Sequence, residues 1–300
     1  MNESVESWTG IYAATTRAEC DERAFMLAAV GIVSVVGFDG LQFSLGVPTH
    51  EVALSLGHLK SYESERLATQ QRVAVRHPIA RVHGAAWVGS LAYVLVLTGV
   101  ALAISNGFWP AYAFDHGVLE SLSVRAGQWW RAWTALTLHW DAPHLVANLG
   151  AGVWFGTLAA RQLGSGWAWL LIVSGAAAAN LFDARFGPSA YRSAGASTAV
   201  FAALGLMAAH TWRTRFHLPQ RRALRWAPLF AGVVLLGWFG SAGEGTDLVA
   251  HALGFLVGGM LGAAAALAPV AAFMLRIPQW LAGAAALASL GAAWWYALSP

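Results

Sequence analysis

The sequence predicts an all-α polytopic membrane protein preceded by a small soluble α+β domain, and three observations predict this fold class. First, 57% of the 300 residues are hydrophobic and only 11% are charged, whereas about 25% are charged in an ordinary soluble domain. Second, the chain has 16 Trp and 32 Gly, which favour membrane interfaces and closely packed membrane helices. Third, long apolar stretches recur after residue 80. Most of the chain is therefore expected to lie in lipid.

Residues 1–68 are predicted to form the small α+β domain, with the order βαββα. The dipeptide Asp39-Gly40 joins two β-rich runs and is a strong hairpin signal. Residues 69–84 then form a polar, basic linker. The expected elements are a strand at 11–15, a helix at 17–30, two β-rich runs within 34–47, and a helix that opens at Pro48-Thr49-His50.

Seven apolar stretches after the linker are predicted to be transmembrane helices. About 20 helical residues cross the hydrocarbon core, so most of the stretches are long enough and the fifth is marginal. The first six make a helical core over residues 85–270, and residues 271–300 add one C-terminal helix. The stretches run over 85–104, 142–160, 166–182, 195–212, 226–241, 247–270 and 278–297.

The arginines predict the orientation of the bundle. Loops rich in Lys and Arg face the cytoplasm, and most arginine-bearing loops fall on one side if the N-terminus is cytoplasmic. The long first loop, 105–141, is the exception, and long loops follow this rule poorly. We therefore expect a multi-pass protein of the cell membrane, the bacterial inner membrane, with a cytoplasmic N-terminus. The arginines on the cytoplasmic side are Arg72, Arg76, Arg81, Arg161, Arg213, Arg215, Arg221, Arg222, Arg225 and Arg276.

Polar side chains inside membrane spans are costly and therefore informative. In this topology the second, fourth and sixth spans all start at the outer face. His144 and Asn148 lie near the start of the second span, Ser197 near the start of the fourth and His251 near the start of the sixth. At 1.5 Å per residue, the four groups lie at nearly the same depth. The sequence thus predicts a polar layer just below the outer surface.

These residue types suit acyl transfer. A serine hydroxyl is a weak nucleophile until a base takes its proton, and histidine titrates in the right range. The oxyanion that develops needs fixed donors, which an Asn amide, an imidazole N–H and a backbone N–H can supply. Gly254 and Gly258 lie on the His251 side of their helix, so a neighbouring helix can approach closely.

Several short motifs resemble those of the rhomboid intramembrane proteases, over residues 85–270. The GxS motif of that family reads Gly195-Ala196-Ser197, and its AHxxG motif starts at Ala250 and includes His251 and Gly254. The family's HxxxN reads His144 to Asn148, with a further histidine at His139, and its Trp-Arg pair reads Trp130-Arg131. The family usually has Gly after the nucleophile, where this chain has Thr198, and the seventh span follows the six-helix core as in some family members.

The resemblance implies a serine endopeptidase that cuts transmembrane proteins within the bilayer. It implies a catalytic dyad of Ser197 and His251, and an oxyanion hole made by His144, Asn148 and the Ser197 backbone N–H. Substrates would be single-pass membrane proteins, cut near small residues in segments where the helix is destabilised.

The sequence is less consistent with other classes of function. The main alternative is a catalytically inactive rhomboid-like protein that binds transmembrane helices, but such proteins lack the Ser or the His. A transporter or channel would need charged residues near mid-bilayer, and none of the seven predicted spans has one there. The chain has no HExxH zinc motif, so we expect no metal or organic cofactor and activity that survives EDTA. No nucleic-acid partner is expected, whereas the N-terminal domain could bind a cytosolic partner.

Some residues are more simply interpreted as structural. The glycines at 254 and 258 are expected to serve packing first, and Trp130-Arg131 to shape the first loop. His210 and His217 lie beside the arginine cluster and are interpreted as solvated. With Cys20 as its single cysteine, the chain cannot form an internal disulfide.

Overall fold

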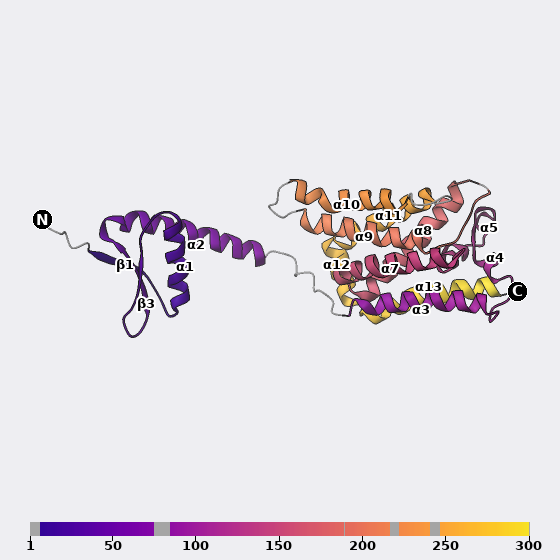
Figure 1. Cartoon of the computed structure of the whole chain (residues 1–300), viewed down its shortest axis with the longest axis horizontal. Coiled ribbons are helices and arrows are strands. Elements are labelled where there is room, and N and C mark those ends of the chain that lie inside the picture. The colour runs from indigo at the N-terminus through magenta and orange to yellow at the C-terminus, as the bar shows by residue number, and fades with distance from the viewer. Residues whose placement is uncertain (1–6, 75–84, 189, 217–221, 241–246, 300) are drawn as a thin grey trace. The chain divides into compact units, whose positions relative to one another are not determined.

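The computed structural model describes residues 7–74, 85–188, 190–216, 222–240 and 247–299. The chain divides into two compact units, Met1–Ile79 and Ala80–Pro300, and each is described by itself. Figure 1 shows a small unit of strands and helices and a larger unit of long helices.

The N-terminal unit holds a three-stranded antiparallel sheet of order β1-β3-β2. Leu27, Leu45 and Val47 are fully buried between the sheet and α1. The Asp39 carboxylate stabilises the turn of the β2–β3 hairpin, since its Oδ1 accepts hydrogen bonds from the Leu41 and Gln42 amides, each at 2.8 Å. The elements are β1 (Trp8–Ala14), α1 (Arg17–Ala29), β2 (Val35–Phe38), β3 (Phe43–Pro48), the 3-10 helix η1 (Thr49–Glu51) and α2 (Val52–Ala74).

The end of this unit differs from the sequence prediction. Helix α2 continues to Ala74, so residues 69–74 of the expected linker are helical. The Ala, Gln and Arg residues of that stretch are good helix formers, which explains the extension. The rest of the predicted linker, 75–84, lies outside the described residues.

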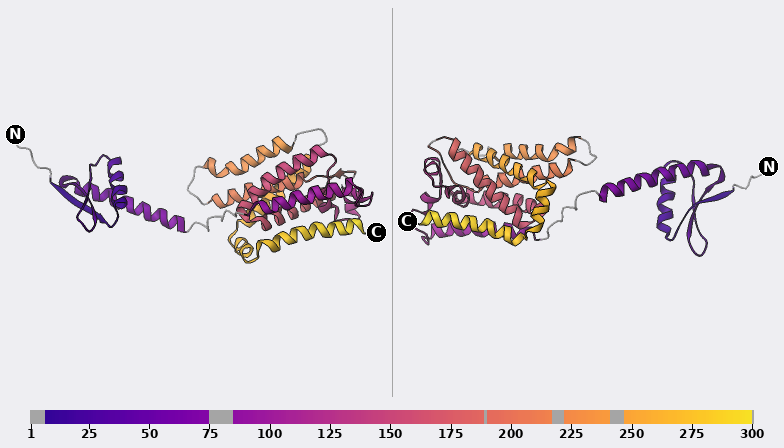
Figure 2. Two further views of the ribbon diagram at one scale, coloured as in Figure 1. Left: turned by 60° about the horizontal axis from the view of Figure 1, so that its bottom comes forward. Right: turned by 180° about the vertical axis from the view of Figure 1, so that it is seen from behind.

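The larger unit is a bundle of long helices that lie side by side, as the views of Figure 2 show. Among the described residues, α3, α8, α11 and α13 are long and apolar enough to cross a membrane. The helices are α3 (Trp87–Ser105), α4 (Ala113–Gly117), α5 (Ser121–Arg125), α6 (Arg131–Thr134), the 3-10 helix η2 (Ala135–Thr137), α7 (Ala142–Leu163), α8 (Ser165–Phe186), α9 (Ser197–Arg215), α10 (Arg222–Gly240), α11 (Leu248–Ala265), α12 (Ala268–Arg276) and α13 (Gln279–Leu298).

Helix α9 forms the centre of the bundle. Its side chains are buried almost without interruption from Thr198 to His210, and it packs against α7, α8, α10 and most extensively α11. A central membrane helix of this kind is shielded from lipid by its neighbours. Polar groups at its start are therefore held inside protein.

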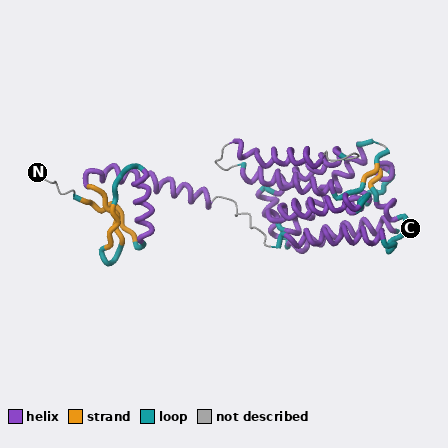
Figure 3. The backbone as a smooth tube through the Cα atoms, viewed as in Figure 1, coloured by secondary structure: helices purple, strands orange, loops and turns teal. Residues whose placement is uncertain are grey.

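The segment between α3 and α7 is folded, although the sequence indicated only a long loop. Its short strand β4 (Leu119–Glu120) pairs with β5 (Arg192–Ser193), which directly precedes α9; the strands are the orange pieces at one end of the bundle in Figure 3. Arg131 is 5% exposed and donates from Nη1 to the carbonyls of Asp115 (2.7 Å) and Val118 (2.8 Å). The guanidinium thus ties α6 to α4 and to the residue before β4.

The sixth apolar stretch ends earlier than predicted. Helix α11 stops at Ala265 and a separate helix, α12, begins at Ala268. Pro269 lies in the first turn of α12, where a residue without an N–H fits. The single stretch expected up to residue 270 was wrong at this end.

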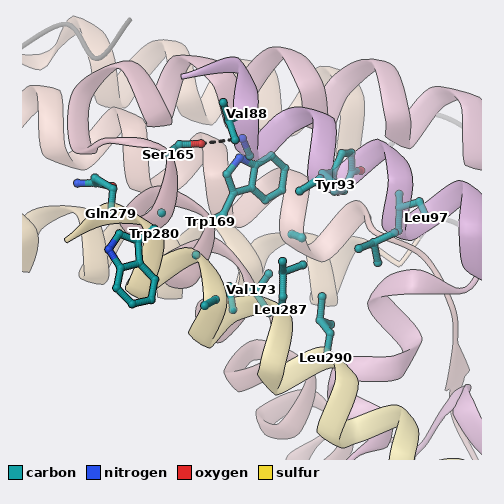
Figure 4. Close-up of a pocket in the computed structure, with 18 of the residues that line it drawn as sticks. Val88, Tyr93, Leu97, Ser165, Trp169, Val173, Gln279, Trp280, Leu287 and Leu290 are labelled. Atoms are coloured by element: carbon teal, nitrogen blue, oxygen red, sulfur yellow. Dashed lines mark hydrogen bonds between the residues drawn. The ribbon is translucent and has the colours of Figure 1, made fainter. Parts of the chain in front are cut away.

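The boundary between α3, α8 and α13 encloses an apolar cavity of about 460 Å³. Figure 4 shows Val88, Tyr93, Trp169, Trp280 and Leu287 around it. Ser165 at its edge accepts a hydrogen bond from the Gly89 amide at 2.7 Å. The lining contains no charged side chain, so this cavity offers no acid or base for chemistry.

Candidate functional site

The candidate nucleophile, Ser197, is half-buried and is the first residue of α9. The backbone N–H groups in the first turn of a helix have no intrahelical acceptor, so the Ser197 N–H points out of the helix start. Two hydrogen bonds fix the turn before Ser197. The Gly195 amide donates to the Ala135 carbonyl at 3.0 Å, and the Ala196 amide donates to His139 Nε2 at 3.3 Å.

Gly195 allows an imidazole to approach the serine. A Cβ atom on Gly195 would lie 2.7 Å from His144 Cε1, 2.9 Å from His144 Nε2 and 3.6 Å from Ser197 Oγ. The His144 ring and the Ser197 hydroxyl therefore border the same small space. A side chain at position 195 would push the ring away, which explains glycine at this position.

The candidate base, His251, is buried near the start of α11. Its ring packs against the Phe201 ring with centroids 4.4 Å apart. Phe201 is one turn beyond Ser197 on α9, so both lie on the same face of that helix. This face of α9 is the one turned toward the imidazole. Asp247 caps α11, with Oδ1 accepting from the Ala250 amide at 2.9 Å.

Glycines bring the backbones of α9 and α11 into contact. A Cβ on Gly254 would lie 2.6 Å from the Thr198 carbonyl oxygen, and one on Gly258 would lie 2.1 Å from that of Ala202. From the other helix, a Cβ on Gly205 would lie 2.0 Å from the Phe255 carbonyl oxygen. We call these glycines, with Gly262, the α9–α11 seam. It fixes the separation of the two helices that carry Ser197 and His251.

Asn148 supplies a buried donor in the same region. It lies one turn beyond His144 on α7, and its side chain is 6% exposed. Its Nδ2 has no hydrogen-bond partner among the described residues. A buried donor without a partner is uncommon in folded proteins, and it suits a site that receives an oxyanion. The backbone of Asn148 is fixed, because its carbonyl accepts from the Tyr93 hydroxyl at 2.8 Å.

His139 contacts the turn before Ser197 through the backbone amide of Ala196. Burial, together with the neighbouring His144 ring, lowers the pKa of His139 to about 4. The imidazole is therefore neutral near pH 7, and its Nε2 can accept the bond from Ala196. The two histidine rings lie edge to face at 5.1 Å.

The second span starts as its sequence predicts. Asp141 is the N-cap of α7 and accepts from the His144 amide at 2.7 Å, and Pro143 lies in the first turn. This local signal sets the helix start and thereby the positions of His144 and Asn148. In the part of the chain that the structure describes, no three His, Cys, Asp or Glu residues are grouped as metal ligands would be.

One interpretation of the sequence was wrong. His210 is 8% exposed, and its Nδ1 shares a hydrogen bond with Gln162 Oε1 at 2.9 Å, so it is buried between α9 and α7 rather than solvated. His217 lies outside the described residues. Sequence reasoning also missed Phe201 and Asp247, although Phe201 is four residues after Ser197 and Asp247 four before His251, a spacing that places residues on one helix face.

The arrangement can perform nucleophilic acyl transfer. The Ser197 hydroxyl lies at the start of α9, and the His251 ring lies on the facing helix α11, against Phe201 one turn further along α9. The His144 ring borders the same space as the hydroxyl, and Asn148, one turn beyond His144, has a buried amide donor. Such a set can activate a nucleophile and stabilise an oxyanion.

Two comparisons with known proteins find similarity. Residues 126–268 match the Rhomboid domain. The chain is also similar to rhomboid protease GluP of Bacillus subtilis (strain 168), with 34% identity over 151 residues. That similarity covers 50% of this chain and 28% of the relative, so the chain spans less than a third of the curated relative it matches.

Proposed function

This chain belongs to the rhomboid family through residues 126–268, and we propose that it is an active intramembrane serine endopeptidase working by a Ser197–His251 dyad. The observation that carries the proposal is the α9–α11 seam. Backbone contact at Gly254 and Gly258 serves an enzyme that must hold a hydroxyl about 3 Å from an imidazole.

The reaction follows the ordinary course of acyl transfer. His251 takes the Ser197 proton as Oγ attacks the carbonyl carbon of the scissile bond. The oxyanion that forms receives hydrogen bonds from Asn148, His144 and the Ser197 N–H. His251 then gives the proton to the leaving amine, which leaves an acyl-enzyme. Water, deprotonated by His251, attacks the ester and releases the second product.

The substrates in this proposal are single-pass membrane proteins, reached through the bilayer. The dyad would lie near the outer face of the cell membrane, and the N-terminus would be cytoplasmic. The arginine-bearing loops support this orientation, and the apolar helices α3, α8, α11 and α13 support a multi-pass protein.

Cleavage in proteoliposomes tests the proposal. The substrate would be a single-pass protein with small residues near its outer helix end, incubated with wild type, Ser197→Ala and His251→Ala. Ser289→Ala on α13 is the matched control, since among the described residues the Ser289 hydroxyl donates to a carbonyl of its own helix, that of Ala286. We expect cleavage by wild type and control alone, at a rate that EDTA does not change. Equal cleavage by Ser197→Ala would refute the dyad.

Thr198 gives the alternative function a specific basis. Thr198 occupies the position where the family usually has glycine, and it is 3% exposed, against Gly254. A crowded residue here favours the inactive helix-binding protein. The variant Thr198→Gly separates the two functions: an active enzyme keeps or raises its rate, whereas an inactive protein that gains activity only with glycine fits the alternative.

The N-terminal unit is proposed as a separate cytoplasmic domain, residues 1–68, that takes no part in catalysis. Phe25, Val33 and Leu41 are exposed on it, which suits a surface for a cytosolic partner. Deleting residues 1–68 should leave cleavage unchanged in proteoliposomes. Loss of cleavage in a still-folded protein would assign this domain a catalytic role.

A further inference from the structure

The helix α13, which lies beyond the matched domain, makes a buried hydrogen bond to the segment beside the site. Trp294 is 7% exposed, and its Nε1 donates to Thr137 Oγ1 at 3.0 Å. The Thr137 hydroxyl in turn donates to the Thr134 carbonyl at 2.8 Å. Each donor is thus paired with one acceptor, and the hydroxyl has one orientation.

The segment that Trp294 contacts is the support of the nucleophile turn. Within residues 134–139, the Ala135 carbonyl accepts from Gly195 and the His139 ring accepts from Ala196. Thr137 lies between these two acceptors. We call residues 134–139 the platform.

Packing adds a second link from α13 to the same turn. Trp294 belongs to one buried cluster with Leu138, which is next to His139, and Ala194, which is next to Gly195. A Cβ on Gly117 would lie 2.7 Å from the Trp294 ring, so the indole packs directly against the Gly117 backbone. The indole therefore packs in one cluster with a residue of the platform and a residue of the turn before Ser197.

We propose that Trp294 is a positioning residue: its indole, through Thr137 and the Leu138–Ala194 cluster, holds the platform and thereby the nucleophile turn. This inference rests on the proposed protease function. It makes the added C-terminal helix a part of the active-site scaffold rather than an appendage to a complete core.

Four variants test the hydrogen bond. Trp294→Phe removes the donor and Thr137→Val removes the acceptor, whereas Thr137→Ser keeps the hydroxyl. Trp295→Phe is the matched control, because Trp295 is the next residue on α13 and 74% exposed. We expect kcat to fall about tenfold to a hundredfold in Trp294→Phe and Thr137→Val with KM unchanged, since small misplacement of a nucleophile costs this much. Thr137→Ser and Trp295→Phe should behave as wild type.

The double variant Trp294→Phe/Thr137→Val should be no slower than the slower single variant, because both changes break one bond. If the fold losses in kcat of the two single variants multiply in the double variant, the proposal is overturned. A lower melting temperature with unchanged kcat in the folded fraction, which is what a merely stabilising tryptophan would give, would also overturn it.

Hydrogen–deuterium exchange separates this inference from the protease function. The Gly195 and Ala196 amides are bonded to the platform, so a peptide covering them should exchange faster in Trp294→Phe and Thr137→Val than in Trp295→Phe. That result would support the positioning role even if no substrate were cut. Equal exchange in all variants would overturn it, whatever the activity.

Discussion

The two sides of the helical bundle are packed in opposite ways. Along the α9–α11 seam, a Cβ at Gly205, Gly258 or Gly262 would lie 2.0 to 2.1 Å from a backbone carbonyl oxygen of the facing helix. Where α3, α8 and α13 meet, helices touch closely at one end, near Gly166, and then enclose the cavity of about 460 Å³.

The difference follows from what each side must hold. A hydroxyl and an imidazole on two helices keep a reactive distance only if the helices do not separate, and small residues such as glycine let two membrane helices pack with their backbones in contact. The apolar cavity holds no charged side chain, so the helices around it need no fixed reactive distance. The seam is therefore expected to hold the dyad together, whereas the cavity, whose lining includes Thr137 and Ala199, lies beside the platform and contains no charged side chain.

Asn148→Ala should have the largest effect among variants that leave the dyad intact. Loss of one oxyanion donor lowers kcat about 10² to 10³-fold, and KM should change little. The measurement is steady-state cleavage in proteoliposomes. A variant with unchanged kcat would remove Asn148 from the oxyanion hole.

Gly258→Ala should be the next most damaging change. Its Cβ would meet the Ala202 carbonyl, a backbone atom that cannot move aside, so we expect a loss of about 3 kcal/mol in stability or an equivalent loss of activity. Gly291→Ala on α13, where nothing lies within 4 Å of the new atom, is the matched control. Thermal unfolding and cleavage measure both. If Gly258→Ala matched the control, the seam would not be rigid.

Acidification should lower the free energy of unfolding through His139, beside the candidate nucleophile. The cavity should contribute nothing to this pH dependence, because its lining has no charged side chain. The pKa of His139 is lowered to about 4 in the folded protein, so between pH 6.5 and pH 4 the unfolded chain binds more protons. Stability should fall as the pH falls through this range, by about 2 kcal/mol.

His139→Gln keeps an acceptor for Ala196 and does not titrate. Unfolding of this variant should therefore depend less on pH than unfolding of wild type. An identical pH dependence would show that His139 is not the group responsible.

Gly283→Ala should have the smallest effect and of opposite sign. The new Cβ would lie 3.6 Å from Gly166 Cα, an ordinary contact, and Ala favours helix over Gly by up to about 1 kcal/mol. We expect slightly raised stability and unchanged cleavage. A strong loss of activity would mean that the α8–α13 boundary is as demanding as the seam.

Local signals explain most of what the sequence could predict. The Asp141 cap and Pro143 predict the start of α7, and hydropathy predicts the approximate positions of the long helices. The glycines at i+3 and i+7 from His251 predict a close helix contact, because small residues at that spacing share a face.

Two helix ends that differ from the prediction had local signals, namely the helix-forming residues of 69–74 and Pro269. The other differences depend on contacts between distant residues. Nothing near His210 in sequence indicates Gln162, which is 48 positions away. The folding of residues 105–141 depends on Arg131 reaching Asp115 and Val118, and the platform depends on Trp294, 157 positions beyond Thr137. Periodicity and propensity describe neighbours along the chain and carry no such information.

The most direct test of an activated serine is labelling of the purified protein in detergent with a fluorescent fluorophosphonate. Wild type, Ser197→Ala and His251→Ala would be compared at equal folded concentration. An activated Ser197 predicts labelling of wild type and none of either variant. Unlabelled wild type that also leaves a small-residue substrate uncut, or labelling that survives Ser197→Ala, would contradict the proposed dyad.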